Sequence, residues 1–160
     1  MWHKKEVTVN TGKNIEIYNE CLNLIDKNDS IELIKALEGK KISDMTDEDG
    51  WSLIKFAISE CNYDIFAILL DKYKDGGVYV DIDGDLLHHV VGVIEGCLST
   101  NCENLENLTR ILKKLISEGF DLNKKDDLGS TVFDWMYVGE FSSFFEEILT
   151  EMRVNVNRIL

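Results

Sequence analysis

Proline is absent from the chain, and no window in it approaches the roughly 18 consecutive apolar residues that a membrane-spanning helix needs. Because proline breaks helices from within, its absence favours continuous helical segments. Residues 1–13 are polar and charged, and they lack the apolar stretch of a secretory signal peptide. These absences predict a cytoplasmic protein that is neither secreted nor inserted in a membrane.

Cysteine is scarce as well, and none of its four residues forms a Cys-x-x-Cys pair. Cys97 and Cys102 are five positions apart and could bridge a loop. In a cytoplasmic chain, however, free and partly buried thiols are the expected state. We therefore expect all of the cysteines to be reduced, namely Cys21, Cys61, Cys97 and Cys102.

Residue types that carry catalysis or bind metal ions do not occur at the spacings of known catalytic or metal-binding motifs. His88 and His89 are adjacent, so on a helix they point about 100° apart and cannot hold one ion by themselves. Residues 81–85 place three aspartates around Gly84, but a calcium loop needs glycine sixth and glutamate twelfth, whereas here Gly92 is twelfth. Phosphate-binding glycine patterns and a nucleophile elbow are also missing. The sequence predicts a protein that is not an enzyme and has no cofactor or metal site.

Charge is strongly one-sided, with 17 lysines and arginines against 30 aspartates and glutamates and a formal net charge of −13. A surface of this sign repels nucleic acid and anionic lipid, and it speeds the encounter with basic proteins. The alternative is that the acidity only maintains solubility. The charge argues against nucleic-acid and membrane partners, and it leaves a basic protein partner open.

Apolar residues recur at helical spacing in short segments separated by acidic turns that contain glycine. Successive turn glycines, Gly50, Gly84 and Gly129, stand 34 and 45 residues apart, which indicates a repeat of about 33 residues with an insertion in its third copy. The segments pair as helix, turn, helix. The predicted helices cover residues 14–25, 31–37, 54–58, 65–70, 86–94, 105–116, 132–137 and 141–152.

With these residues in place, the chain resembles the ankyrin-repeat family. Residues 47–57 read Asp-Glu-Asp-Gly-Trp-Ser-Leu-Ile-Lys-Phe-Ala and follow the family's opening motif, with serine for threonine and lysine for histidine. Residues 126–136 repeat that opening, and residues 111–123 match the closing part of the motif, with glycine and asparagine after the helix. His88 falls at the structural histidine of the repeat. The first copy is degenerate, as a terminal capping repeat would be.

The resemblance implies an all-α ankyrin-repeat solenoid of helix-turn-helix units with short finger turns. After an N-terminal extension of residues 1–13, residues 14–160 would form a single domain. Its approximate repeats are 14–45, 46–80, 81–125 and 126–160. The insertion at 99–104 would lengthen the turn within the third repeat, either as a tolerated surface loop or as a functional one.

In this family the fingers and the first helix of each pair line the surface that holds partners, and the acidic residues concentrate on the predicted fingers. One aspartate per finger is explained by turn and helix capping. For Trp51 two interpretations stay open: an exposed interface anchor, or a ring folded over the neighbouring repeat. Trp135 is predicted to be in the core. The predicted partner-binding residues are Asp47, Glu48, Asp49, Trp51, Glu60, Asp81, Asp83, Asp85, Asp127 and Ser130.

These features predict a non-catalytic protein-interaction module that is monomeric when free. The preferred interpretation is an acidic inhibitor or immunity-type protein that binds and occludes a basic protein such as a toxin. The alternative is an adaptor or effector that tethers a cellular or host protein. An enzyme in a divergent helical fold and a structural homo-oligomer are the remaining alternatives.

Overall fold

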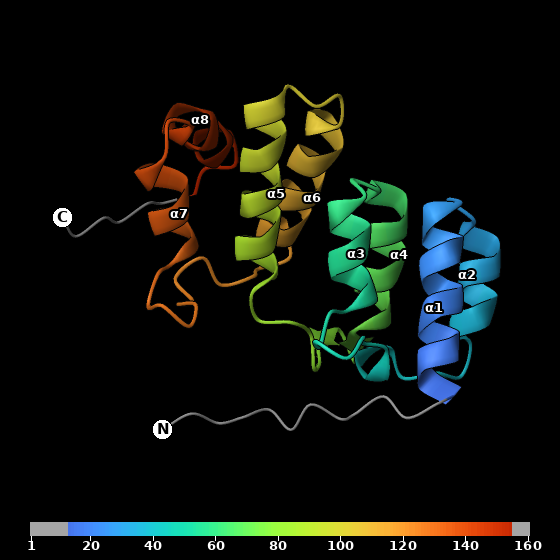
Figure 1. Cartoon of the computed structure of the whole chain (residues 1–160). Coiled ribbons are helices and arrows are strands. Elements are labelled where there is room, and N and C mark those ends of the chain that lie inside the picture. The colour runs from blue at the N-terminus through green and yellow to red at the C-terminus, as the bar shows by residue number, and fades with distance from the viewer. Residues whose placement is uncertain (1–12, 155–160) are drawn as a thin grey trace. The chain divides into compact units, whose positions relative to one another are not determined.

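A computed structural model describes residues 13–154, and its architecture is all-α, as the sequence predicts (Figure 1). Each predicted helical segment overlaps one helix. None of the helices in this range is long and apolar enough to cross a membrane. The helices are α1 (Lys13–Asp26), α2 (Ser30–Leu37), α3 (Leu53–Ser59), α4 (Tyr63–Lys72), α5 (Leu86–Thr100), α6 (Leu105–Ser117), α7 (Val132–Val138) and α8 (Ser142–Glu151).

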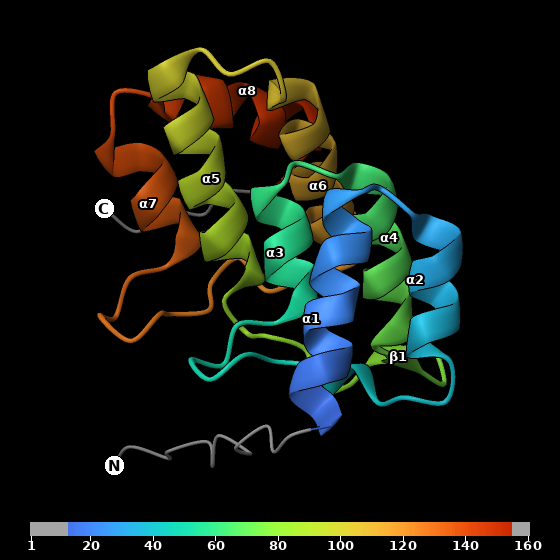
Figure 2. The same cartoon turned by 45° about the vertical axis from the view of Figure 1, so that its right-hand side comes forward.

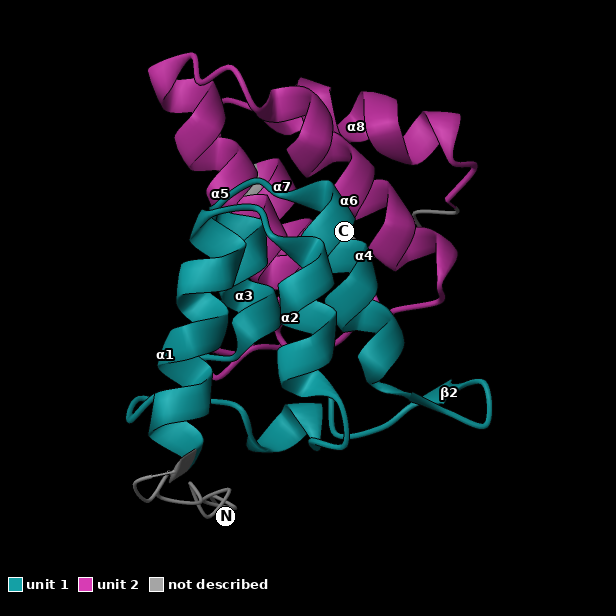
Figure 3. Cartoon of the chain, turned by 90° about the vertical axis from the view of Figure 1, so that its right-hand side faces the viewer, with its two compact units in different colours: residues 1–83 teal, residues 84–160 magenta. Residues whose placement is uncertain are grey.

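Two small elements were not predicted. A 3-10 turn, η1 (Ile42–Asp44), follows α2, and a two-residue hairpin of β1 (Lys74–Asp75) and β2 (Val78–Tyr79) follows α4. The strands are antiparallel, with Lys74 opposite Tyr79. The hairpin projects from the end of α4 (Figure 3).

Short polar side chains start several helices by accepting a hydrogen bond from a backbone N–H of the first turn. Asp29 accepts from the amide of Glu32, and Asn62 accepts from the amide of Ile65 at 3.1 Å. Thr131 and Asp134 form a reciprocal capping box at the start of α7. Because these groups lie next to the helices they cap in sequence, the helix starts were predictable.

The chain divides into two compact units, unit 1 (1–83) and unit 2 (84–160), which are coloured separately in Figure 3. In unit 1, α1 packs on α2 and α3 on α4, and α1 also contacts α3. In unit 2, α5 packs on α6 and α7 on α8, and α5 contacts α7. Each unit is therefore two helix pairs joined through the first helix of each pair (Figures 1 and 2).

Each unit has its own apolar core, filled by the helix faces that the 3.6-residue spacing brings together. Burial of one such large side chain contributes about 1.5–3 kcal/mol. Every predicted repeat contains one helix pair. Fully buried core residues include Leu33, Ile54, Ile58, Phe66 and Leu69 in unit 1, and Leu86, Val90, Ile111, Leu112 and Phe145 in unit 2.

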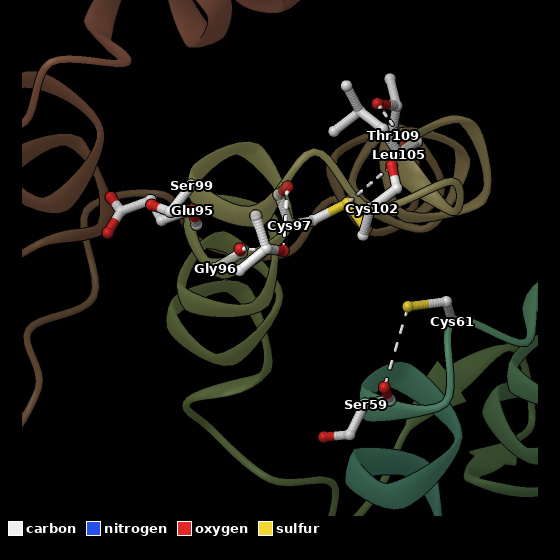
Figure 4. The surroundings of a disulfide bond; sticks show 10 residues. Ser59, Cys61, Glu95, Gly96, Cys97, Ser99, Cys102, Leu105 and Thr109 are labelled. Carbon is white, nitrogen blue, oxygen red and sulfur yellow. Dashed lines mark hydrogen bonds between the residues drawn. A yellow bond between two sulfur atoms is a disulfide. The ribbon is translucent and has the colours of Figure 1, made fainter.

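The expectation of four free thiols is wrong for one pair, because Cys97 and Cys102 form a disulfide with Cα atoms 4.9 Å apart (Figure 4). The cause is local: Asn101 takes the left-handed conformation at the end of α5, with φ 53°, and turns the chain back at once. Cys21 is free and buried, and Cys61 is free and half-buried.

The insertion predicted at 99–104 is only partly a loop, because its first two residues, Ser99 and Thr100, belong to α5. α5 runs to Thr100, well past the predicted end at residue 94, so the connection to α6 is only residues 101–104. Ser99 donates a hydrogen bond to the carbonyl oxygen of Glu95 (2.9 Å), and Thr100 donates to that of Gly96 (3.0 Å). The hydroxyls of Ser99 and Thr100 are thus satisfied within α5, although the sequence suggested a loop at these positions.

Candidate functional site

The acidic turn of residues 47–52 precedes α3, and we call it turn A. The Oδ1 atom of Asp47 accepts hydrogen bonds from the backbone N–H groups of Asp49 (2.9 Å) and Trp51 (2.8 Å). The Gly50 amide bonds to the Asp47 carbonyl oxygen at 3.1 Å. Gly50 adopts φ +80°, a left-handed conformation that side chains rarely take, so glycine is favoured there. The next residue but one, Ser52, caps α3.

The turn of residues 126–131 precedes α7 and repeats this construction, and we call it turn B. The Oδ1 atom of Asp126 accepts from the amides of Leu128 and Ser130, both at 2.9 Å. The Gly129 amide bonds to the Asp126 carbonyl oxygen at 3.0 Å, and Gly129 has φ +81°. Turns A and B thus form the same hydrogen bonds, which supports an internal repeat at the level of local structure.

The first aspartate of each turn has a structural task. The Asp47 carboxylate is engaged by the amides of its own turn, as the expectation of one turn-forming aspartate per finger requires. Glu48 and Asp49, the next two carboxylates of turn A, are exposed. In turn B the predicted binding residue Asp127 is exposed too. The exposed carboxylates of turns A and B are therefore those that follow the turn-forming aspartate.

Turn A borders a hollow of about 290 Å³ in unit 1. Ile15, Tyr18 and Asn19 of α1 form one side, and the other side is formed by the turn residues Asp47, Glu48 and Asp49. Burial raises the pKa of Tyr18 to about 12, and the Asp47 carboxylate adds to the rise. The phenol is therefore neutral at physiological pH and retains its proton for donation. The hollow combines a hydroxyl donor with carboxylate acceptors.

Trp51 lies near the end of turn A and is 40% exposed, so its ring is not folded into the core. Its amide is held by Asp47, so the backbone that carries the ring is fixed. The Nζ atom of Lys55, one helical turn later, lies 5.8 Å from the centre of the indole ring. The exposed indole therefore lies at a fixed point of the backbone, between Asp49 and the start of α3.

The structure disperses the other predicted binding residues of unit 1. Asp83 is half-buried and accepts a hydrogen bond from Ser52, so its carboxylate is engaged inside the fold. Asp81 pairs with Lys41 at 3.4 Å on the surface. Glu60 is exposed at the end of α3. Turn A therefore gathers the four neighbouring predicted residues, Asp83 is bonded to its last residue, Ser52, and Glu60 and Asp81 lie outside it.

Trp135 corrects a prediction, because its side chain is 37% exposed and not part of the core. The buried face of α7 is formed by Val132 and Met136, four residues apart, which leaves the intervening tryptophan on the flank. Its indole N–H donates to the Oδ2 atom of Asp126 at 3.0 Å. The His88 ring lies perpendicular to it at 5.5 Å. Turn B therefore holds this tryptophan by hydrogen bonding.

His88 is buried at the start of α5. Its Nε2 atom lies 3.0 Å from the carbonyl oxygen of Ser130 in turn B. The predicted binding residue Ser130 therefore has both its amide and its carbonyl engaged, although it is only half-buried. Asp85, the remaining predicted residue, is exposed just before α5.

A second hollow, of about 360 Å³, lies in unit 2 and contains residues that sequence reasoning missed. It is lined by Glu95 of α5, by Asp134 and Trp135 of α7, and by Ser130 and Gly139. Of these, only Ser130 was predicted. Glu95 sits in an apolar helical segment, and nothing in its local sequence indicates a site, since the packing of α5 against α7 is what brings it to Trp135. Within residues 13–154, no group of three or more histidine, cysteine, aspartate and glutamate side chains is arranged to hold a metal ion.

Comparison with known proteins yields no match to this chain, either among models of protein families or among curated proteins.

Proposed function

We propose that this chain is a non-catalytic, ankyrin-like protein-binding module whose partner is a basic protein. In the preferred form of the proposal it is an inhibitor or immunity-type protein that occludes the active surface of a toxin. The observation that carries the proposal is turn A, where exposed Trp51 follows two exposed carboxylates, Glu48 and Asp49, that line a hollow.

The geometry of turn A favours binding because its anchor is already ordered. Binding usually costs about 0.5–1.5 kcal/mol for each flexible side chain that becomes fixed. In turn A the hydrogen bonds to Asp47 fix the backbone, and the ring of Trp51 is large and has few rotatable bonds. Tryptophan in a well-packed position is among the residues that contribute most at interfaces.

Electrostatics supply the preference for a basic partner. The formal charge of −13 attracts a cationic protein from a distance, and Glu48 and Asp49 provide exposed acceptors where it would dock. Lys55 already lies over Trp51, so we assign the indole the role of apolar anchor and the two carboxylates the pairing with basic side chains. The recurrence of turn A as turn B and the helix pair within each predicted repeat support the ankyrin-like part of the proposal.

The test is affinity purification of the tagged chain from its native cells at low and high salt, with identification of bound proteins by mass spectrometry. A Glu48→Lys, Asp49→Lys variant is compared with a Glu38→Lys, Asp71→Lys control, whose residues are exposed and lie outside the hollow. Each carboxylate-to-lysine change adds two positive charge units, so both variants go from a net charge of −13 to −9. The pair therefore separates the site from the overall charge.

We expect a basic partner that is retained at low salt, weakened at high salt, lost in the turn A variant and kept by the control. Equal loss in both variants would show that net charge alone drives binding, and retention by both would reject turn A as the site. A Trp51→Ala variant then tests the anchor, with an expected loss of at least 2 kcal/mol, or about 30-fold in Kd. Inhibition of the purified partner's activity on binding supports the inhibitor form, and unaltered activity supports the adaptor.

A further inference from the structure

The hollow of unit 2 is built around an aromatic ring that is fixed in place. At one end of Trp135 the indole N–H is held by Asp126. Near the other end, the ring lies against Gly92 of α5, where an added Cβ would stand at ordinary contact distance, 3.5 Å, from the Cζ3 atom. The perpendicular His88 ring supports it from the core. The ring is thus preorganised while more than a third of the residue remains open to solvent.

Two carboxylates line the same hollow as this ring. Glu95 and Asp134 line the hollow together with Trp135, and its described lining includes no lysine or arginine. Burial raises the pKa of the Glu95 carboxyl, because partial desolvation penalises its charged form. An incoming cation would relieve that penalty. Asp134 uses its Oδ2 atom in the capping box of α7.

Two other aromatic rings of the described chain, exposed Trp51 and half-buried Tyr79, have a cation over them. Lys55 lies over Trp51, and the Nζ atom of Lys74 lies 5.2 Å from the ring centre of Tyr79. In residues 13–154 no lysine or arginine is placed over Trp135 in this way. Tryptophan is the best aromatic partner for a cation, and the attraction strengthens as the pair loses water. The hollow is therefore complementary to a cationic group from outside.

Arginine fits this arrangement better than lysine does. Its planar guanidinium stacks on an aromatic face and directs its N–H groups outward in the ring plane, where carboxylates can accept them. We propose that the hollow of unit 2 receives an arginine side chain of the protein partner, which stacks on Trp135 and pairs with Glu95 and Asp134. This inference rests on the proposed function, and it assigns the chemistry of one anchoring residue of the partner.

The inference can be tested without the partner by titrating the full chain with a blocked pentapeptide that has one central arginine between glycines. The matched control peptide carries citrulline, which has nearly the same shape but no charge. The probe is the indole N–H signal of Trp135 in a two-dimensional NMR spectrum. It is assigned among the three tryptophans as the signal lost in a Trp135→Phe variant.

We expect the arginine peptide to shift the Trp135 signal with a Kd on the order of millimolar, and the citrulline peptide to bind at least several-fold more weakly. Glu95→Gln should weaken the arginine peptide about three- to tenfold, because it removes a charged acceptor. Glu106→Gln, an exposed first-turn glutamate of α6 outside the hollow, should leave the affinity unchanged. Both variants are checked for a spectrum of unchanged dispersion.

An unshifted Trp135 signal, equal shifts with both peptides, or an affinity insensitive to Glu95→Gln would overturn the inference. The proposed function fails separately. Partner capture that depends on Glu48 and Asp49, together with no response at Trp135, rejects the arginine pocket and keeps the binding module. A specific response at Trp135 with no captured protein rejects the module as proposed and leaves the pocket as a site for a free guanidinium compound.

Discussion

Replacing Ser52 with alanine tests whether turn A is anchored by a buried polar network. Ser52 is 2% exposed, and its Oγ atom accepts a hydrogen bond from the amide of Lys55 while donating one to Asp83. Its hydroxyl is also hydrogen-bonded to Tyr73, which is 3% exposed. Burial raises the pKa of the Tyr73 phenol, and the Asp83 carboxylate adds to the rise. A single hydroxyl therefore links α3, the end of α4 and the segment after the hairpin.

The expected cost follows from what the alanine removes. Loss of the helix cap costs about 1 kcal/mol. Asp83 and Tyr73 each then lose a hydrogen-bonding partner, Tyr73 at a buried position, which costs about 1–3 kcal/mol more. We expect Ser52→Ala to destabilise unit 1 by about 2–4 kcal/mol. Thr131 is the matched control, because it caps α7 from the equivalent position of turn B but is half-buried, and the hydrogen bonds of its hydroxyl are to Asp134 of its own capping box. Thr131→Ala should cost about 1 kcal/mol.

The assay is native-state hydrogen exchange followed by mass spectrometry of fragments, which reports the opening free energy of each unit separately. Urea unfolding alone would merge the two units if they unfolded together. The reasoning is refuted if the two alanine variants destabilise their own units by the same amount, within about 0.5 kcal/mol. In that case the Asp83 carboxylate would not depend on Ser52, and it would be available for the partner contact that the sequence predicts.

Three further predictions concern unit 2. Because Cys97 and Cys102 are bonded, a thiol-reactive reagent should detect two thiols in the denatured, unreduced chain and four after reduction. A count of four before reduction would contradict this. Gly96→Ala should stabilise the fold by about 0.5–1 kcal/mol in chemical unfolding, since Gly96 lies inside α5 with open space at its Cβ position; a loss of stability would show a hidden contact. The amides of turn B and the Trp135 indole lower the pKa of Asp126, with the Ser130 amide contributing most. Its stabilising effect should therefore be complete above the ordinary aspartate pKa and be lost as pH falls through the lower folded value. An acid titration of the Trp135 indole N–H signal with its midpoint at or above the ordinary value would be inconsistent with these bonds.

Much of the molecule is determined by contacts between neighbours in sequence, and those parts were predictable. Helix starts depend on caps such as Asn62 and Thr131, which bond to amides three residues ahead. Turn A depends on one aspartate and on a glycine with positive φ, which are visible as a pattern before α3. The grouping of Glu48 and Asp49 with Trp51 follows from the same short segment. The sequence alone therefore determined the helices, their pairing order and the acidic turn.

Tertiary packing decided which side chains are engaged and which are presented. Asp83 and Asp85 look alike in the sequence, but only Asp83 reaches the buried Ser52, 31 positions away. Trp135 has the pattern of a core residue, yet the docking of α7 through Val132 and Met136 leaves its ring at the surface. No local rule brings Glu95 of α5 beside that ring, because their proximity comes from the contact between two helices whose starts are more than 40 residues apart. Such proximity depends on how the apolar faces of two helices pack together, and it cannot be predicted from the residues next to Glu95 or Trp135 in the sequence.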